Sequence, residues 1–194
     1  MATQDISIWD ENGIRAADVI EDTENNLNRL ATTGVSSNID FEKIKNGLLF
    51  SVQIHSASLS SNQELVVIFT TPSDKNVFLT WDYNLALQGN WVVWENAVRV
   101  GGTTELAYNH ERNSTNTYSS QIWWGAAGDY TVVGAIDLET RYFGISGGVK
   151  SAGGGGSLDV WVLKRSTTYA FVLQSEKPGN KGDIKINFYE VDYP

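Results

Sequence analysis

The sequence of 194 residues contains no cysteine, three prolines and few basic residues. Without cysteine, the chain can form no disulfide, no thiolate zinc site, no iron–sulfur cluster and no thiol nucleophile. No stretch approaches the about 18 consecutive apolar residues of a membrane span. The start, Met1–Ile8, lacks the basic and apolar regions of a secretory signal. We therefore expect a protein that is made and kept soluble in a cytoplasm, unless something other than a signal peptide carries it out.

Basic residues are outnumbered 14 to 23, which gives a net charge of −9. Residues 1–40 contain 8 acidic and 2 basic residues, net −6, and the other 154 contain 15 and 12, net −3. Nucleic-acid binding requires clustered Lys and Arg against the phosphates, and the longest basic run here is Lys164-Arg165. We therefore expect no nucleic-acid partner and no membrane partner.

Residues 1–40 form an acidic N-terminal arm and linker in this interpretation. Apolar residues recur at heptad-like spacing within residues 14–31, at Ala16, Ile20, Leu27 and Leu30. This spacing predicts a partly helical arm, although three asparagines in the range weaken the helix and leave it in need of a partner surface. With Trp9 just upstream, we expect the arm to dock on another subunit or protein, and the alternative is a frayed terminus.

From Gly47 onward, apolar and polar residues alternate with a period of two. The longest alternating run extends from Val77 to Leu87, and shorter ones include Phe50–Ile54, Tyr169–Leu173 and Ile184–Phe188. Further strands are expected at 63–70, 91–100, 104–109, 119–124, 130–139 and 158–163. About ten strands without intervening helices predict an all-β fold, an antiparallel β-sandwich or jelly-roll-like domain over residues 41–194.

A glycine-rich stretch covers residues 144–156. Glycine loops that bind phosphate place Lys and Ser or Thr after the glycines and before a helix, whereas Lys150-Ser151 precede the last four glycines and a strand follows. The stretch is therefore interpreted as a long, mobile hairpin loop or as a surface where two backbones approach closely.

Residues that could carry chemistry are sparse. The two histidines, His55 and His110, are far apart in sequence, and no Gly-x-Ser-x-Gly elbow is present. Asp137 and Glu139 are two residues apart on an expected strand, as acid–base pairs can be, but such pairs are more often solvent-exposed. We therefore expect no enzyme, no catalytic residue, no metal and no cofactor.

The sequence contains seven tryptophans, and those that face solvent could form a surface that binds a protein or a sugar. Adjacent strand residues point to opposite faces, so Trp123 and Trp124 cannot both face the core. Trp91 and Trp94 are separated by an odd number of positions, so they too should project to opposite faces of a strand. Exposed large aromatics usually mark a protein–protein interface, and stacking on sugars is the second interpretation.

Three segments in a fixed order resemble a family of small tailed-bacteriophage virion proteins. The first is Phe69–Trp81, with its Thr-Pro turn between two strands. The second is Tyr108–Thr117, similar to the family's Asn-x-x-Arg-Asn-Ser-x-Asn run, from which His110-Glu111 departs. The third extends from Gly147-Gly148 through Gly153–Gly156 and Val160–Lys164 to Thr168-Tyr169 and the final strand at Ile184–Glu190.

The resemblance covers about residues 45–192 and implies a head decoration or capsid-stabilising subunit. It implies a capsid-bound β-sandwich, a homotrimer, that contacts the major capsid protein or another virion protein. The chain would then occupy the capsid surface of the virion and the host cytoplasm during assembly. No catalytic residue is carried over from the family.

The candidate interface combines the arm, the Arg112 loop, the tryptophan pair and the glycine stretch. Its residues are Trp9, Ile20, Leu27, Leu30, Asn109, Arg112, Asn113, Asn116, Trp123, Trp124, Gly153 and Gly154. In the loop, one guanidinium and three amides could tie neighbouring strands or subunits together, or satisfy only the loop's own backbone. The alternative function is a carbohydrate-binding, host-recognition module on the virion surface or tail, with a glycan as partner and Trp91, Trp94, Trp123 or Trp124 as platform.

Overall fold

The computed structural model describes residues 7–9, 15–22, 27–31, 43–143, 153–156 and 160–192. Contacts between residues divide the chain into two units, Met1–Glu42 and Lys43–Pro194. A short helical turn at residues 43–45 begins the second unit. Each unit is described by itself below.

The first unit contains a small antiparallel sheet in the order β1-β2-β3. Its strands are β1 (Ser7–Trp9), β2 (Arg15–Asp22) and β3 (Leu27–Ala31). The prediction of a partly helical arm across residues 14–31 is wrong wherever the structure describes that range, because β2 and β3 occupy it as strands. The β-branched Val19 and Ile20 favour an extended backbone, and Asn28, a poor helix former, lies in β3.

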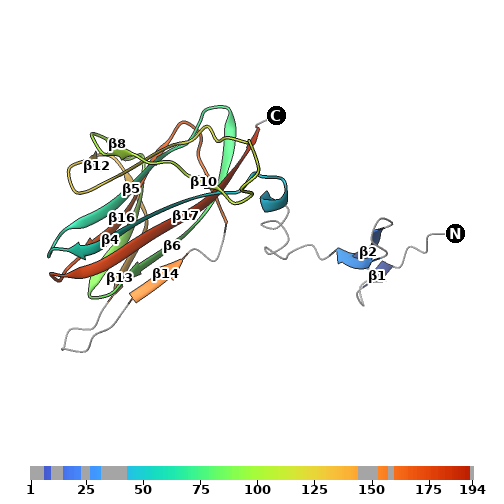
Figure 1. The fold of residues 1–194 in the computed structure, drawn as a ribbon, viewed down its shortest axis with the longest axis horizontal. Coiled ribbons are helices and arrows are strands. Elements are labelled where there is room, and N and C mark those ends of the chain that lie inside the picture. Colours follow the sequence, from blue (N-terminus) through green and yellow to red (C-terminus); the bar gives the residue numbers. More distant parts are fainter. Residues whose placement is uncertain are drawn as a thin grey trace. The chain divides into compact units, whose positions relative to one another are not determined.

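The second unit is a sandwich of two antiparallel sheets, so the predicted all-β sandwich is confirmed. Sheet 1 has the order β10-β4-β17-β6-β14, with β15 also paired to β6. Figure 1 shows β17, in red, between β4 and β6, and β14, in orange, beside β6. The strands of sheet 1 are β4 (Phe50–Leu59), β6 (Lys75–Leu85), β10 (Tyr108–Asn109), β14 (Gly153–Gly156), β15 (Trp161–Leu163) and β17 (Asn180–Asp192).

Sheet 2 has the order β13-β7-β16-β5-β11-β9. Its strands are β5 (Glu64–Thr70), β7 (Gly89–Glu95), β9 (Thr103–Thr104), β11 (Gln121–Gly125), β13 (Ile136–Phe143) and β16 (Thr168–Ser175). A separate two-stranded ribbon pairs β8 (Val98–Arg99) with β12 (Tyr130–Thr131). The chain therefore changes sheet between β9 and β10, at one edge of the sandwich.

The core lies between the two sheets and follows the period-two pattern of the sequence. In β6, every second residue from Val77 to Leu85 is buried, and these side chains meet inward residues of β16 and β7. The rings of Trp81 and Phe171, from opposite sheets, lie 5.6 Å apart. A sheet that is apolar on one face gains stability by burying that face against another sheet, which is why the alternation predicts this architecture.

A second apolar layer covers the outer face of sheet 2. Val66 and Ile68 of β5 and Ala170 and Val172 of β16 are buried there, with Tyr130 of the ribbon packed against them. Strands β5 and β16 are thus buried on both faces. This explains why Leu65–Phe69 is a continuous apolar run rather than an alternating one.

Candidate interaction surface

Four exposed valines lie in or directly beside the β8–β12 ribbon and are here called the valine ribbon: Val98, Val100, Val132 and Val133. Their exposed fractions are 55%, 63%, 36% and 88%. Val98 lies opposite Thr131 in the ribbon, and Arg99 lies opposite Tyr130. Because side chains alternate along a strand, Val98 and Val100 project away from the face that holds Arg99. Exposed apolar side chains are candidates for contact with another protein where they form a contiguous patch.

The underside of the ribbon is anchored to sheet 2 by polar contacts. The guanidinium of Arg99 lies 4.2 Å from the centroid of the Trp123 ring. The Tyr130 hydroxyl donates to a Glu64 carboxylate oxygen at 3.0 Å, and the Gln174 amide donates to the other oxygen at 3.4 Å. Burial raises the pKa of Glu64, and burial together with the charge of Glu64 raises the pKa of Tyr130, so Tyr130 remains a donor at neutral pH.

Asp129 fixes the turn that leads into β12. Its carboxylate accepts a hydrogen bond from the Ala126 backbone at 2.9 Å, and its carbonyl accepts from Val100 at 2.8 Å. A Cβ at Gly101 or Gly125 would collide with the Asp129 carboxylate, so a larger residue at either position would displace that carboxylate. The valine ribbon is therefore a braced surface.

The Arg112 loop is tied to the turn at Asn46-Gly47. The Asn109 amide donates to the Gly47 carbonyl at 2.8 Å, and the Asn116 amide donates to the Asn46 carbonyl at 3.0 Å. The Asn113 backbone donates to the Glu111 carboxylate at 3.0 Å. Arg112 is exposed, and its side chain makes no hydrogen bond or ion pair with another described residue. Of the predicted loop residues, Asn109 and Asn116 thus tie the loop to the turn at Asn46-Gly47. Arg112 faces solvent.

The four tryptophans that the strand pattern placed in pairs on opposite faces have different environments. Trp91 is fully buried in the core, while Trp94 and Trp123 are half-buried in the outer layer of sheet 2. Trp124 is 41% exposed. Its strand partner is the core residue Val67, whereas the partner of Trp123 is Ile68 of the outer layer. The predicted opposite orientation of each pair is confirmed, and Trp124 alone among the four is open to solvent.

The glycine strand β14 packs closely on β6. Gly153 and Gly154 lie opposite Leu85 and Asn84. A Cβ at Gly155 would lie 2.6 Å from the Tyr83 hydroxyl, and one at Gly156 would lie 2.8 Å from the Trp81 carbonyl oxygen. The interpretation of these glycines as a close-packing surface is confirmed for Gly155 and Gly156, Gly153 and Gly154 pair with β6, and residues 144–152 lie outside the described residues.

Four predicted interface residues belong to the first unit. Trp9 lies on β1 opposite Arg15, and Ile20 lies on β2 opposite Arg29. On β3, Leu27 lies opposite Asp22 and Leu30 lies opposite Val19. Their side chains lie outside the described part of the chain, so their role in docking stays a prediction.

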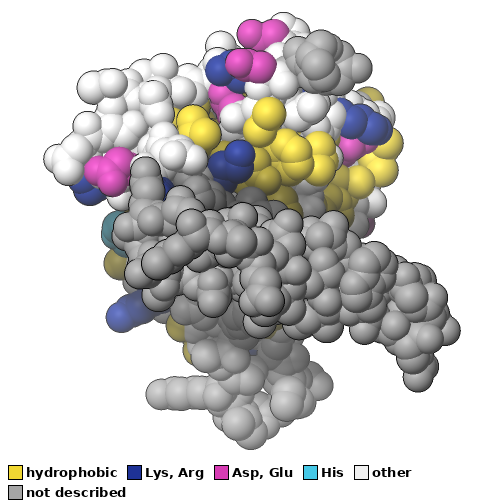
Figure 2. Space-filling view, turned by 90° about the vertical axis from the view of Figure 1, so that its right-hand side faces the viewer, with side chains coloured by type: hydrophobic (Ala, Val, Ile, Leu, Met, Phe, Trp, Pro, Cys, Tyr) yellow, Lys and Arg dark blue, Asp and Glu magenta, His cyan; other side chains and the backbone are white. Residues whose placement is uncertain are grey.

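A second apolar surface lies on the outer face of sheet 1. Phe78 of β6 lies between Val162 of β15 and Tyr189 of β17, and the Phe78 and Tyr189 rings stack with centroids 4.7 Å apart. Val162 is 60% exposed. Figure 2, a space-filling view turned by 90° from Figure 1, shows hydrophobic side chains gathered beside Lys and Arg side chains on one face of the described residues. Phe78, Val162 and Tyr189 are here called the Phe78 strip; Val162 is its exposed member, whereas Phe78 is half-buried and Tyr189 is buried.

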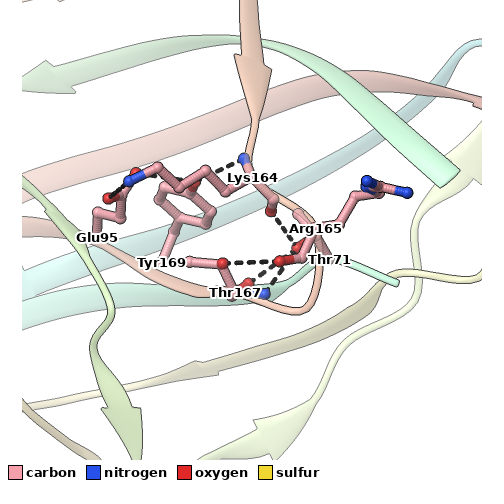
Figure 3. A network of polar contacts seen from close by, with 6 residues as sticks. All are labelled: Thr71, Glu95, Lys164, Arg165, Thr167 and Tyr169. Atoms are coloured by element: carbon pink, nitrogen blue, oxygen red, sulfur yellow. Dashed lines mark hydrogen bonds and ion pairs between the residues drawn. The ribbon is translucent and has the colours of Figure 1, made fainter. Parts of the chain in front are cut away.

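A polar network joins the two sheets (Figure 3). Glu95 accepts hydrogen bonds from the Lys164 ammonium at 2.6 Å and from the Tyr169 hydroxyl at 3.1 Å. The Thr71 hydroxyl donates to the Lys164 carbonyl at 2.6 Å and accepts from the Thr167 backbone at 3.0 Å. Burial raises the pKa of Tyr169, opposed in part by the hydrogen bond from the Lys164 backbone. Sequence reasoning missed this network, although a carboxylate at the inward position of Glu95 was a signal for it.

Comparison with protein-family models, with curated proteins and with solved structures found no match to this chain. In the ranges that the structure describes, no group of three His, Asp or Glu side chains could hold a metal ion. Within the same ranges, no helix has the length and apolar character needed to span a membrane.

Proposed function

We propose that this chain is a structural subunit of a tailed-bacteriophage virion that decorates the head and stabilises the capsid without catalysis. The valine ribbon carries this proposal, because it is an apolar surface braced from below by Arg99 and Tyr130. The ordered resemblance of the segments at 69–81, 108–117 and 147–190 supports the identity of the partner as the major capsid protein or another virion protein.

The mechanism needs only selective binding. A subunit that binds the assembled shell and not its dissociated parts stabilises the shell by mass action. Burial of the four valines would contribute through the hydrophobic effect, at about 25 cal/mol per Å² of apolar area. A homotrimer would present three ribbons at once and raise the apparent affinity through multivalency.

The test uses purified heads that lack the protein. Wild-type protein, the double variant Val98→Ser/Val133→Ser and the matched control Val162→Ser are each added, and bound protein and heat resistance of the heads are measured. We expect wild type and the control to bind and to raise heat resistance, and the ribbon variant to lose both. Light scattering should give three times the chain mass of 21.4 kDa.

Two outcomes would contradict parts of the proposal. If wild type neither binds heads nor changes their heat resistance, the decoration function is wrong. If Val162→Ser abolishes binding and the ribbon variant does not, the function stands and the contact surface is the Phe78 strip instead.

A further inference from the structure

A groove lies where the chain crosses from sheet 2 to sheet 1, between β9 and β10. It is open to solvent and has a volume of about 640 Å³, within the size range of small-ligand sites. Its floor is apolar and is formed by Phe50, Tyr118 and Ile122. The segments Thr104–Ala107 and Asn116–Gln121 provide most of its remaining lining. None of the four valines of the valine ribbon lines the groove.

The groove is held open by hydrogen bonds between its walls. The Ala107 backbone donates to the Tyr118 hydroxyl at 2.9 Å, and the Glu105 backbone donates to the Ile122 carbonyl at 2.9 Å. Ser120 donates from its backbone and its hydroxyl to the Glu190 carboxylate, at 2.7 and 2.6 Å. The Tyr118 ring also packs edge-on against Phe50, with centroids 5.2 Å apart. The shape is therefore preformed, which reduces the entropic cost of binding.

The charges of the lining select against ionic ligands. Among the lining residues that the structure describes there is no Lys or Arg, and Glu105 alone is charged. An anionic ligand such as a phosphate would find no countercharge there, and burying it would be unfavourable. The lining instead combines an aromatic floor with neutral amide and hydroxyl groups.

Several of these polar groups have hydrogen-bonding capacity left over. The side chains of Thr104, Thr117 and Gln121 are exposed and make no hydrogen bond with another described residue. One oxygen of Glu105 accepts from Leu106 at 3.3 Å, so the other is available as an acceptor. Amides both donate and accept, and carboxylates accept, as the hydroxyls of a sugar ring require.

We propose that this groove binds a neutral saccharide. The apolar face of a pyranose ring lies against Tyr118, and the ring hydroxyls bond to Gln121, Thr117 and Glu105. This activity goes beyond the proposed capsid role and does not depend on it. Of the four tryptophans expected from sequence as a stacking platform, Trp123 lines the groove, whereas Trp91, Trp94 and Trp124 do not.

The test is an NMR titration of isotope-labelled protein with maltotriose, cellotriose and chitotriose at millimolar concentration, with sialyllactose as the anionic comparison. We expect at least one neutral sugar to shift amide signals of residues 104–107 and 117–122, and sialyllactose to shift none. Gln121→Ala removes about one hydrogen bond and should weaken binding about fivefold. Thr117→Trp, a change at an exposed position, should fill the groove and abolish binding.

Trp124→Ala is the matched control, because Trp124 is an exposed aromatic on the same strand as Gln121 but lies outside the lining. It should bind sugar like wild type. The proposal is overturned if no neutral sugar shifts the groove signals, or if Trp124→Ala abolishes binding while Thr117→Trp leaves it unchanged. It is equally overturned if the signals shift with protein concentration alone, which would show a second copy of the chain in the groove.

Discussion

The Lys164 ammonium lies 2.6 Å from a carboxylate oxygen of Glu95, and the two residues belong to opposite sheets. Their side chains differ in exposure, 66% for Lys164 and 7% for Glu95. The ammonium would therefore remain hydrated without its partner, whereas the carboxylate would stay buried with the Tyr169 hydroxyl as its remaining side-chain donor. This asymmetry determines which half of the pair tolerates substitution.

We expect Lys164→Met to destabilise the domain by about 1–2 kcal/mol, because it leaves a buried carboxylate without its counterion and water only partly compensates. Glu95→Gln should cost about 0.5 kcal/mol, since an amide still accepts from Tyr169 and Lys164 turns to solvent. Urea unfolding of both variants measures the difference. A larger loss for Glu95→Gln would contradict this account.

The glycine strand yields a second prediction. Gly156→Ala should destabilise the domain by about 1–3 kcal/mol, because the new methyl would lie 2.8 Å from the Trp81 carbonyl oxygen and force β14 away from β6. Gly155→Ala meets the Tyr83 hydroxyl instead. Adding Tyr83→Phe to Gly155→Ala should therefore restore part of the lost stability, and thermal unfolding that shows no such recovery would argue against the clash.

The contact under the valine ribbon should depend on pH. Burial raises the pKa of Glu64 above its ordinary value of 4.5, so the folded state favours the protonated form. Protonated Glu64 therefore contributes its full stabilisation of the folded state below the ordinary pKa. This stabilisation is lost as the pH rises through the pKa that Glu64 has in the folded state. We expect Glu64→Gln, which keeps an acceptor for Tyr130, to be more stable than wild type at neutral pH and equal to it at about pH 4. Melting temperatures of both proteins across this range measure the effect, and parallel curves would refute it.

Glu190 joins β17 to the start of β11. Its side chain is 4% exposed and accepts bonds from the Ser119 backbone and from both donors of Ser120. Glu190→Gln replaces one acceptor oxygen with a donor and should cost about 1–3 kcal/mol. Asp192→Asn is the matched control, because the Asp192 side chain is 92% exposed although it also pairs with Lys75. Chemical unfolding should show little change for the control, and equal losses for the two variants would exclude a special role for Glu190.

Much of the sandwich could be predicted because burial on one face leaves an alternating pattern. The run from Val77 corresponds closely to β6 (Lys75–Leu85). The predicted single strand at 91–100 is instead β7 and β8, because Asn96 adopts a left-handed conformation with φ 62° between them. The predicted strand at 104–109 is also divided, since β9 and β10 pair with different sheets. Local patterns do not reveal which remote strand a segment will join.

The sequence by itself determined the fold class, the acidic N-terminal segment and which residues of each strand share a face, because these depend on composition and on the two-residue period of an extended chain. The tertiary structure decided which outward residues are covered. Trp123 is half-buried because the ribbon places Arg99 over it, whereas Trp124 is exposed although its strand partner Val67 lies in the core. The groove likewise exists because residues 103–109 cross between the sheets. Exposure depends on contacts between segments far apart in the chain, and no local pattern encodes those contacts.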